Sequence, residues 1–185
     1  MTPVMPPERT FNCEECGFDA RTMSEEDLVA ACSSFARRFR APLTRFLPGE
    51  DGGAIVRLRP AEGVWSALEY AAHVRDLLSF YRERIELVLA DDRPTLHAVA
   101  FGSRPEEETA NQEDPTVVAD GVTAEATALS ELLGRLDQDQ WPRVGLSSDG
   151  SGAERTVRVL AERAVHDASH HLLDIGRSLR AARSR

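Results

Sequence analysis

The chain has 185 residues, of which 42% are hydrophobic and 29% are charged. This length allows a single domain with a sizeable core, and the composition is typical of a globular protein rather than a disordered one. Acidic residues outnumber basic residues 31 to 22, and the resulting net charge of −9 repels phosphate backbones and anionic lipid head groups. We therefore expect neither nucleic acid nor a membrane among the partners.

The apolar runs and the cysteines indicate a cellular location. No stretch approaches the roughly 20 apolar residues that a membrane span needs, and the first ten residues hold no signal-peptide core. Three cysteines, an odd number, do not make a disulfide framework. We expect a cytoplasmic protein whose thiols are reduced or bound to a metal.

The N-terminal residues differ from the rest of the chain. Residues 1–12 contain three prolines and no periodic pattern, which predicts a mobile or surface-draped tail. A Cys-x-x-Cys pair follows, so we assign 1–23 to an N-terminal extension and 24–185 to a helical bundle. Ser24 can cap a first helix, which has acidic residues in its first turn and an apolar stripe as far as about Phe46.

The next segment predicts the clearest helix of the chain. Four glycine and proline residues within 47–53 end the first helix, and we interpret Ile55–Leu58 as extended. Ser66 and Glu69 form a capping box. Apolar residues at steps of three and four then continue to Val88, which predicts the second helix.

Two more amphipathic segments complete the predicted fold. Between 91 and 111 the periodicity dissolves into proline, glycine and glutamate, which predicts a long crossover connection. We expect a third helix over 115–136, with a later start allowed by Gly121, and a fourth from Thr156 to about Ala182. The pattern has little strand signal and predicts an all-α four-helix bundle.

Three of the five histidines lie between His166 and His171. Residues four apart share a helix face, so His166 and His170 can direct their imidazoles at one point, whereas His171 is turned about 100° away. Two such ligands usually need a third from elsewhere. His73 is the natural candidate, because it lies mid-helix on the apolar stripe and should point into the bundle.

Three imidazoles would hold one divalent metal ion and leave a coordination position open for water or substrate. We expect zinc, with nickel or iron as alternatives. Asp76, Asp167 and Asp174 could orient the imidazoles by accepting hydrogen bonds. The other interpretation is that these histidines are partly buried and satisfied by ordinary hydrogen bonds, with the acidic residues simply solvated.

Cys13 and Cys16, followed by Gly17, have the spacing of a zinc knuckle. One knuckle supplies only two of four ligands and the sequence holds no second one, which argues against an independent zinc ribbon. The pair could be redox-active, could reach the histidines or a partner subunit, or could lie reduced on a packed N-terminal strap. We favour the strap. Cys32 lies on the apolar stripe of the first helix and is interpreted as a buried thiol.

Two segments carry a resemblance to a known family. The residues from Trp65 to Asp76 and from His166 to Ile175 resemble the DinB-like superfamily. More narrowly, the chain looks like the actinobacterial members that open with a Cys-x-x-Cys-Gly-Phe-Asp motif, which here runs from Cys13 to Asp19. The likeness spans most of the chain.

The resemblance implies a four-helix bundle of DinB-like topology, a divalent metal on a three-histidine site and, in many members, a homodimer. His73 matches the family's histidine on the second helix, and His166 and His170 match its His-x-x-x-His pair. Relatives include S-transferases that use mycothiol or bacillithiol, and the mycothiol-dependent maleylpyruvate isomerase. The loop at 95–99 lacks the tryptophan and aspartate expected in this subgroup, so substrate contacts are not carried over.

Three functions remain open on the sequence. The first is a metal-dependent S-transferase, in which a small thiol such as mycothiol binds the metal as a thiolate and attacks a small-molecule substrate. The second is a non-catalytic bundle with a structural metal, or with a binding or stress-response role. The third is a metal-dependent hydrolase, which is weakened because no glutamate occupies an obvious general-base position beside the histidines.

Overall fold

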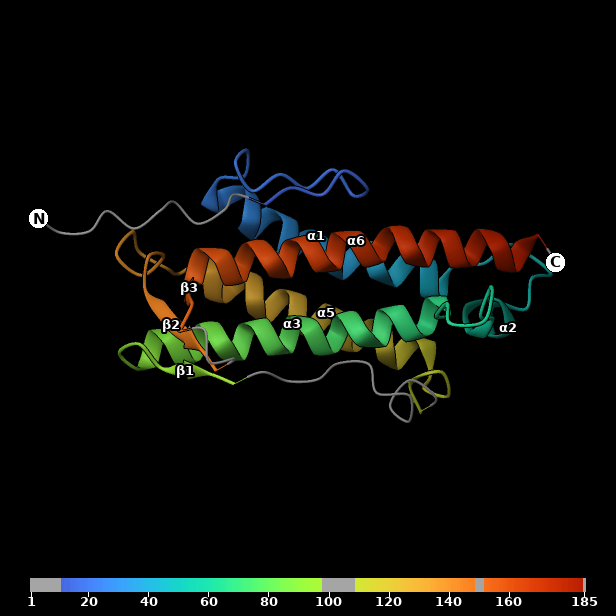
Figure 1. The fold of residues 1–185 in the computed structure, drawn as a ribbon. Helices are drawn as coiled ribbons and strands as arrows, with labels where there is room; N and C mark the ends of the chain where they lie inside the picture. Colours follow the sequence, from blue (N-terminus) through green and yellow to red (C-terminus); the bar gives the residue numbers. More distant parts are fainter. Residues whose placement is uncertain (1–10, 98–108, 149–151, 185) are drawn as a thin grey trace, which may run out of the picture.

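The computed structural model describes residues 11–97, 109–148 and 152–184. Within these residues four long helices lie side by side (Figure 1): α1 (Glu25–Thr44), α3 (Ala67–Ala90), α5 (Pro115–Leu133) and α6 (Val157–Arg183). α1 and α3 each pack against both α5 and α6, so the helices surround a shared core. The predicted four-helix bundle is confirmed. None of the described helices combines the length and the hydropathy of a membrane span.

Side-chain caps fix where the helices begin. Ser24 and Ser66 each accept a hydrogen bond from the backbone N–H three residues later, and the acidic side chain there accepts one back, as the capping boxes predict. Asp114 caps α5, which starts at Pro115 despite Gly121 and ends before the predicted boundary. The largest fully buried side chains belong mainly to these helices: Leu28, Phe35, Phe39, Leu43, Leu68, Leu78, Ile85, Leu129, Leu133 and Ile175.

The segment that we interpreted as extended is a short helix, so that prediction was wrong. α2 (Gly52–Arg57) includes most of Ile55–Leu58. Asp51 caps it by accepting a hydrogen bond from the backbone N–H of Ala54, and Val56 is fully buried. Gly52 and Gly53 were interpreted as breakers, but they occupy the first turn, where a cap and one buried side chain suffice to hold the helix.

A small sheet, which the sequence pattern did not predict, lies at one end of the bundle (Figure 1). β1 (Thr95–Leu96) pairs in parallel with β2 (Val144–Ser147), and β2 pairs antiparallel with β3 (Glu154–Thr156). Gly145 allows close packing, because a Cβ there would lie 2.7 Å from Cγ of Leu96. β3 leads directly into α6, so the sheet helps to fix where that helix begins.

The described part of the N-terminal extension packs against the bundle. Phe18 and Ala20 are buried in its core, and Phe11 contacts His166 on α6. The boundary between 23 and 24 stays a prediction. Most of the predicted tail, the middle of the crossover (98–108) and the loop positions 149–151 lie outside the described residues.

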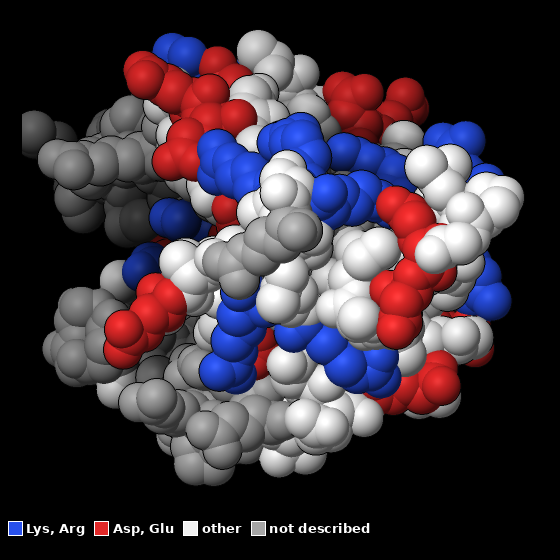
Figure 2. Space-filling model, turned by 90° about the vertical axis from the view of Figure 1, so that its right-hand side faces the viewer, with Lys and Arg blue, Asp and Glu red and all other residues white. Residues whose placement is uncertain are grey.

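The end of the molecule that carries α2 and the C-terminus of α6 is rich in charge (Figure 2). Arginine and acidic side chains adjoin each other there instead of forming a surface of one sign. Two ion pairs, Arg59 with the buried Glu69 and Arg183 with Glu50, join segments that are separate in the sequence. The contacts therefore help to hold the loops between the helices in place.

Candidate metal centre

The Cys-x-x-Cys segment forms a tight loop against α6. The backbone N–H of Cys13 donates to the carbonyl of Phe18 over 2.8 Å, and that of Gly17 donates to the carbonyl of Cys13 over 2.9 Å. Gly17 has a φ of +75°, which glycine adopts without strain. A backbone bridge between Asn12 and Asp19 closes the loop. These bonds fix the positions from which both thiols extend.

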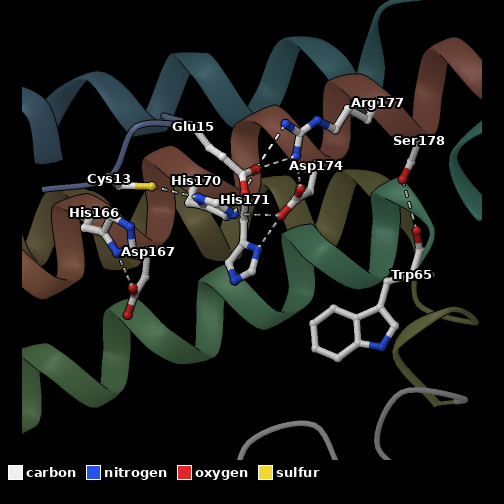
Figure 3. Close-up of polar contacts among 10 residues, drawn as sticks. All are labelled: Cys13, Glu15, Trp65, His166, Asp167, His170, His171, Asp174, Arg177 and Ser178. Carbon is white, nitrogen blue, oxygen red and sulfur yellow. Dashed lines mark hydrogen bonds and ion pairs between the residues drawn. The ribbon is translucent and has the colours of Figure 1, made fainter. Parts of the chain in front are cut away.

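Two cysteines and two histidines converge where this loop meets α6. The sulfur atoms of Cys13 and Cys16 and one ring nitrogen each of His166 and His170 all lie within 4.8 Å of one another. Cys13 Sγ is 3.5 Å from Nδ1 of His170 (Figure 3). The two imidazoles lie on one face of α6 with ring centroids 5.7 Å apart, as their spacing predicts. Four ligand atoms of two chemical types therefore face one point.

The carboxylate of Asp167 fixes the orientation of the His166 ring. Oδ1 of Asp167 lies 2.7 Å from Nδ1 of His166 (Figure 3), and the Tyr81 hydroxyl donates to Oδ2 of Asp167 over 2.7 Å. With Nδ1 engaged in this way, Nε2 is the nitrogen of His166 that remains for the thiols. Asp167 therefore has the acceptor role that the sequence left open beside simple solvation, whereas Asp76 pairs with Arg75 instead.

A second acidic group supports the other side of the centre. Asp174 Oδ2 lies 3.1 Å from Nδ1 of His171 and 3.9 Å from Nε2 of His170. Arg177 donates to Asp174 and to Glu15, each over 3.1 Å (Figure 3). Because Glu15 lies between the two cysteines, this ion pair ties the loop to the same helix that carries the histidines.

The surroundings shift the pKa values of the two thiols in opposite directions. The backbone N–H of Cys16, followed by the side chains of His166 and His170, lowers the pKa of Cys13 to about 6. Burial raises the pKa of Cys16. Burial alone would lower the pKa of His166, but its hydrogen bonds with Asp167 and Cys13 outweigh that effect and raise it. Cys13 is therefore largely a thiolate at neutral pH, which is the form that binds metals.

His73 takes part in a different cluster. Its ring lies 5.0 Å from that of Trp65 and 5.1 Å from that of His171, between centroids. Burial lowers the pKa of His73 to about 4, so its imidazole is neutral at neutral pH. Within the described residues, the group of possible metal ligands joins His166 and His170 to two thiols and does not include His73. The set of three histidines stays a prediction.

The cysteines supply the donors that the histidine pattern did not identify. The segment is packed against the bundle with free thiols, as the favoured strap requires, and these thiols also reach the histidines, as one of the alternatives proposed. The available signal was that a Cys-x-x-Cys pair and a His-x-x-x-His pair each supply two of four ligands. Cys32 is fully buried as predicted, and burial raises its pKa to about 12.

Solved structures share this fold. YfiT from Bacillus subtilis, described as a probable metal-dependent hydrolase with an unusual four-helix bundle topology, superposes with a TM-score of 0.75 at 14% identity over 95% of this chain and 91% of its own. The mycothiol-dependent maleylpyruvate isomerase superposes with a TM-score of 0.64 at 14% identity, over 85% of this chain and 62% of its own. At such low identity these likenesses concern the fold.

Sequence comparison gives the family. No curated protein sequence matches the chain significantly. Residues 52–175, which include α2, α3, α5 and most of α6, match the DinB superfamily. This match includes the histidines of the candidate centre but not the Cys-x-x-Cys loop. The chain belongs to the DinB superfamily.

Proposed function

We propose that this chain binds one zinc ion through Cys13, Cys16, His166 and His170. The main support is that four donor atoms from the N-terminal loop and from α6 converge within 4.8 Å. Two thiolates and two imidazoles form a common tetrahedral ligand set for zinc, and soft thiolates disfavour magnesium and calcium.

The chemistry of the donors fits this ion. Thiols bind zinc as thiolates, and Cys13 has a pKa of about 6. The hydrogen bond from His166 to Asp167 leaves the opposite ring nitrogen as the ligand, which is the usual arrangement behind a metal-bound histidine. Two thiolates with two neutral imidazoles balance the charge of a divalent cation.

A site with four protein donors is typical of structural zinc. We infer that the ion joins the N-terminal extension to α6, where the loop already has an ion pair from Glu15 to Arg177. In this role the metal stabilises the folded chain rather than carrying out a reaction. This role corresponds to the second function considered from the sequence, a non-catalytic bundle with a structural metal.

Thiol-dependent S-transfer is the second candidate, and the partial exposure of the donors favours it. All four residues are half-buried, so a small thiol such as mycothiol can approach the centre from solvent. Because four protein donors fill a tetrahedral site, the incoming thiol would have to replace one of them. The substrate in this case would be a small electrophilic molecule.

Metal analysis of protein purified without a histidine tag tests the site. We expect about one zinc per chain in the wild type, and a strong loss in Cys13→Ser and His170→Ala. Cys32→Ala should keep its zinc, because that thiol is buried away from the centre. If His73→Gln loses the metal while Cys13→Ser keeps it, the three-histidine site is correct and the proposed one is not.

Cobalt substitution distinguishes the two candidate functions. Cobalt held by two thiolates gives thiolate-to-metal charge-transfer absorption in the near ultraviolet, and Cys16→Ser should reduce it. A small thiol that enters the coordination shell changes the ligand-field bands. A spectrum that does not respond to mycothiol or to glutathione rejects S-transfer and leaves the structural role.

A further inference from the structure

A groove between α1 and α6 adjoins the candidate metal centre. Its volume is about 520 Å³, which lies in the range of small-molecule sites. Cys16 of the N-terminal loop lines it, so a molecule in the groove would lie beside one of the proposed zinc ligands. Arg38 and Pro42 come from α1, and the remaining wall comes from α6.

The groove has one cationic group. Among the described residues no carboxylate pairs with Arg38, whose guanidinium carbon lies 5.7 Å from the ring centroid of Phe35. Arg40, which is further along α1, is instead paired with Asp120. The guanidinium of Arg38 is therefore available for an anion, and its planar donors match a carboxylate in two parallel hydrogen bonds.

The rest of the wall is mainly apolar, and one of its residues, Gly176, has no side chain. Leu172 and Leu173 line the groove, and Leu173 is among the large hydrophobic side chains exposed to solvent, at 37%. At Gly176 an added Cβ would meet no atom within 4 Å. Glycine inside a helix costs about 1 kcal/mol relative to alanine. Here its missing side chain leaves space in the groove.

We propose that this groove binds a small carboxylate with a short apolar chain. The carboxylate lies on the guanidinium of Arg38, and the chain lies over Leu172, Leu173 and Gly176. Binding in the groove does not itself require the metal. Cys16 belongs both to the groove and to the candidate metal centre. A substrate role for the bound molecule would therefore rest on the second candidate function, S-transfer, and not on the structural zinc.

Hexanoate binding to the groove is tested by titrating the zinc-loaded full-length protein with hexanoate. The amide chemical shifts are recorded at each step of the titration. We expect saturable shifts around Ser169 and Gly176, and weaker binding of hexanamide, which has the same chain without the charge. Arg38→Gln should weaken hexanoate binding about three- to tenfold, as for loss of one partly exposed ionic contact. Arg37→Gln is the matched control and should change nothing, because Arg37 does not line the groove.

Filling the groove provides a second, independent test. Gly176→Leu should abolish hexanoate binding while keeping the helix, because leucine favours helices more than glycine does. Equal binding of hexanoate and hexanamide, or equal effects of Arg37→Gln and Arg38→Gln, would overturn the groove proposal. So would unchanged binding in a folded Gly176→Leu variant. If that variant does not fold, the comparison of Arg37 with Arg38 decides.

The zinc content of each sample separates this inference from the proposed function. A wild-type protein that holds zinc but does not bind hexanoate overturns the groove and leaves the metal site intact. A protein without zinc that binds hexanoate through Arg38 overturns the metal site and keeps the groove as a carboxylate site. The two proposals can therefore fail separately.

Discussion

The ring of His166 is held by a chain of hydrogen bonds that begins on a different helix. The Tyr81 hydroxyl on α3 donates to Asp167, and Asp167 accepts from Nδ1 of His166. Burial would raise the pKa of Asp167, but its hydrogen bonds with His166 and Tyr81 keep it lowered, so it is a carboxylate at neutral pH. The ring nitrogen of His166 that is left for the candidate centre is thus determined by two residues outside the group of possible ligands.

Removing the charge of Asp167 tests this arrangement. Asp167→Asn should lower zinc affinity about 10- to 100-fold, because the ring of His166 loses the acceptor that orients it and increases its basicity. Competition with a coloured chelator measures the affinity. Asp76→Asn is the matched control, since that carboxylate is 54% exposed and pairs with Arg75. Equal affinities of the two variants would show that Asp167 does not act on the centre.

His73 should make the stability of the fold depend on pH. Burial lowers its pKa from 6.5 to about 4, whereas in the unfolded chain it keeps its ordinary value. Between these values the unfolded state binds more protons than the folded state, so the free energy of unfolding falls as the pH falls from 6.5 towards 4.

Urea unfolding at several pH values measures this dependence. A chelator is present throughout, so that metal loss does not contribute to the free energy of unfolding. His73→Gln should show a shallower fall in the free energy of unfolding over this pH range than the wild type, and His97→Gln should behave as the wild type does. An identical slope in all three proteins would contradict a buried neutral His73.

The sequence alone could predict the two histidines of the candidate centre, because their relation is local. Two histidines four apart share a helix face whatever surrounds them, so His166 and His170 followed from spacing. The approach of Cys13 to His170 joins positions 157 residues apart, and no periodicity connects them. The choice between His73 and the thiols depended on how the N-terminal loop packs, which is a tertiary contact.

The same division between local and tertiary signals holds for whole elements. α1 and α3 began where predicted, because Ser24 and Ser66 make capping boxes within a few residues of chain. α2 and the sheet were missed because they are too short to show a period. Their stability comes from contacts with the bundle, such as the burial of Val56 and the packing of Leu96.

Two glycines in the same protein should respond oppositely to alanine. A Cβ at Gly145 of β2 would lie 2.7 Å from Leu96 and 2.9 Å from Val88, whereas one at Gly176 of α6 would meet nothing within 4 Å. Gly145→Ala should therefore destabilise the protein by about 1–3 kcal/mol through overpacking. Gly176→Ala should stabilise it by about 0.5–1 kcal/mol through helix propensity. Urea unfolding measures both, and effects of the same sign would contradict the packing of β2 against α3.

Across the whole molecule, three kinds of contact attach the N-terminal loop to the bundle. Phe18 is buried in the common core, Glu15 pairs with Arg177, and the two thiols face the histidines. The ion pair is exposed at both ends, and such pairs contribute at most about 1 kcal/mol. The apolar contact and the metal should therefore provide most of the attachment.

Chelation should reveal how much the metal contributes. At free zinc about 1,000-fold above the dissociation constant, binding stabilises the folded state by about 4 kcal/mol, which corresponds to a melting temperature higher by roughly 8–16 °C. A strong chelator should remove this increment from the wild type and have no effect on Cys13→Ser, which already lacks it. A shift of the same size in both proteins would mean that the chelator acts elsewhere.

Hydrogen exchange shows where the stability is lost. If zinc joins the loop to α6, chelation should accelerate amide exchange most at residues 11–20, whose backbone bonds close the loop, and least in the centres of α3 and α5. The backbone N–H of Cys13, which donates to Phe18, is the most informative probe. Unchanged exchange there in the metal-free protein would mean that Phe18 and the Glu15 pair hold the loop by themselves. The four donors would then be a site preformed by the fold, because the loop would reach α6 without the ion.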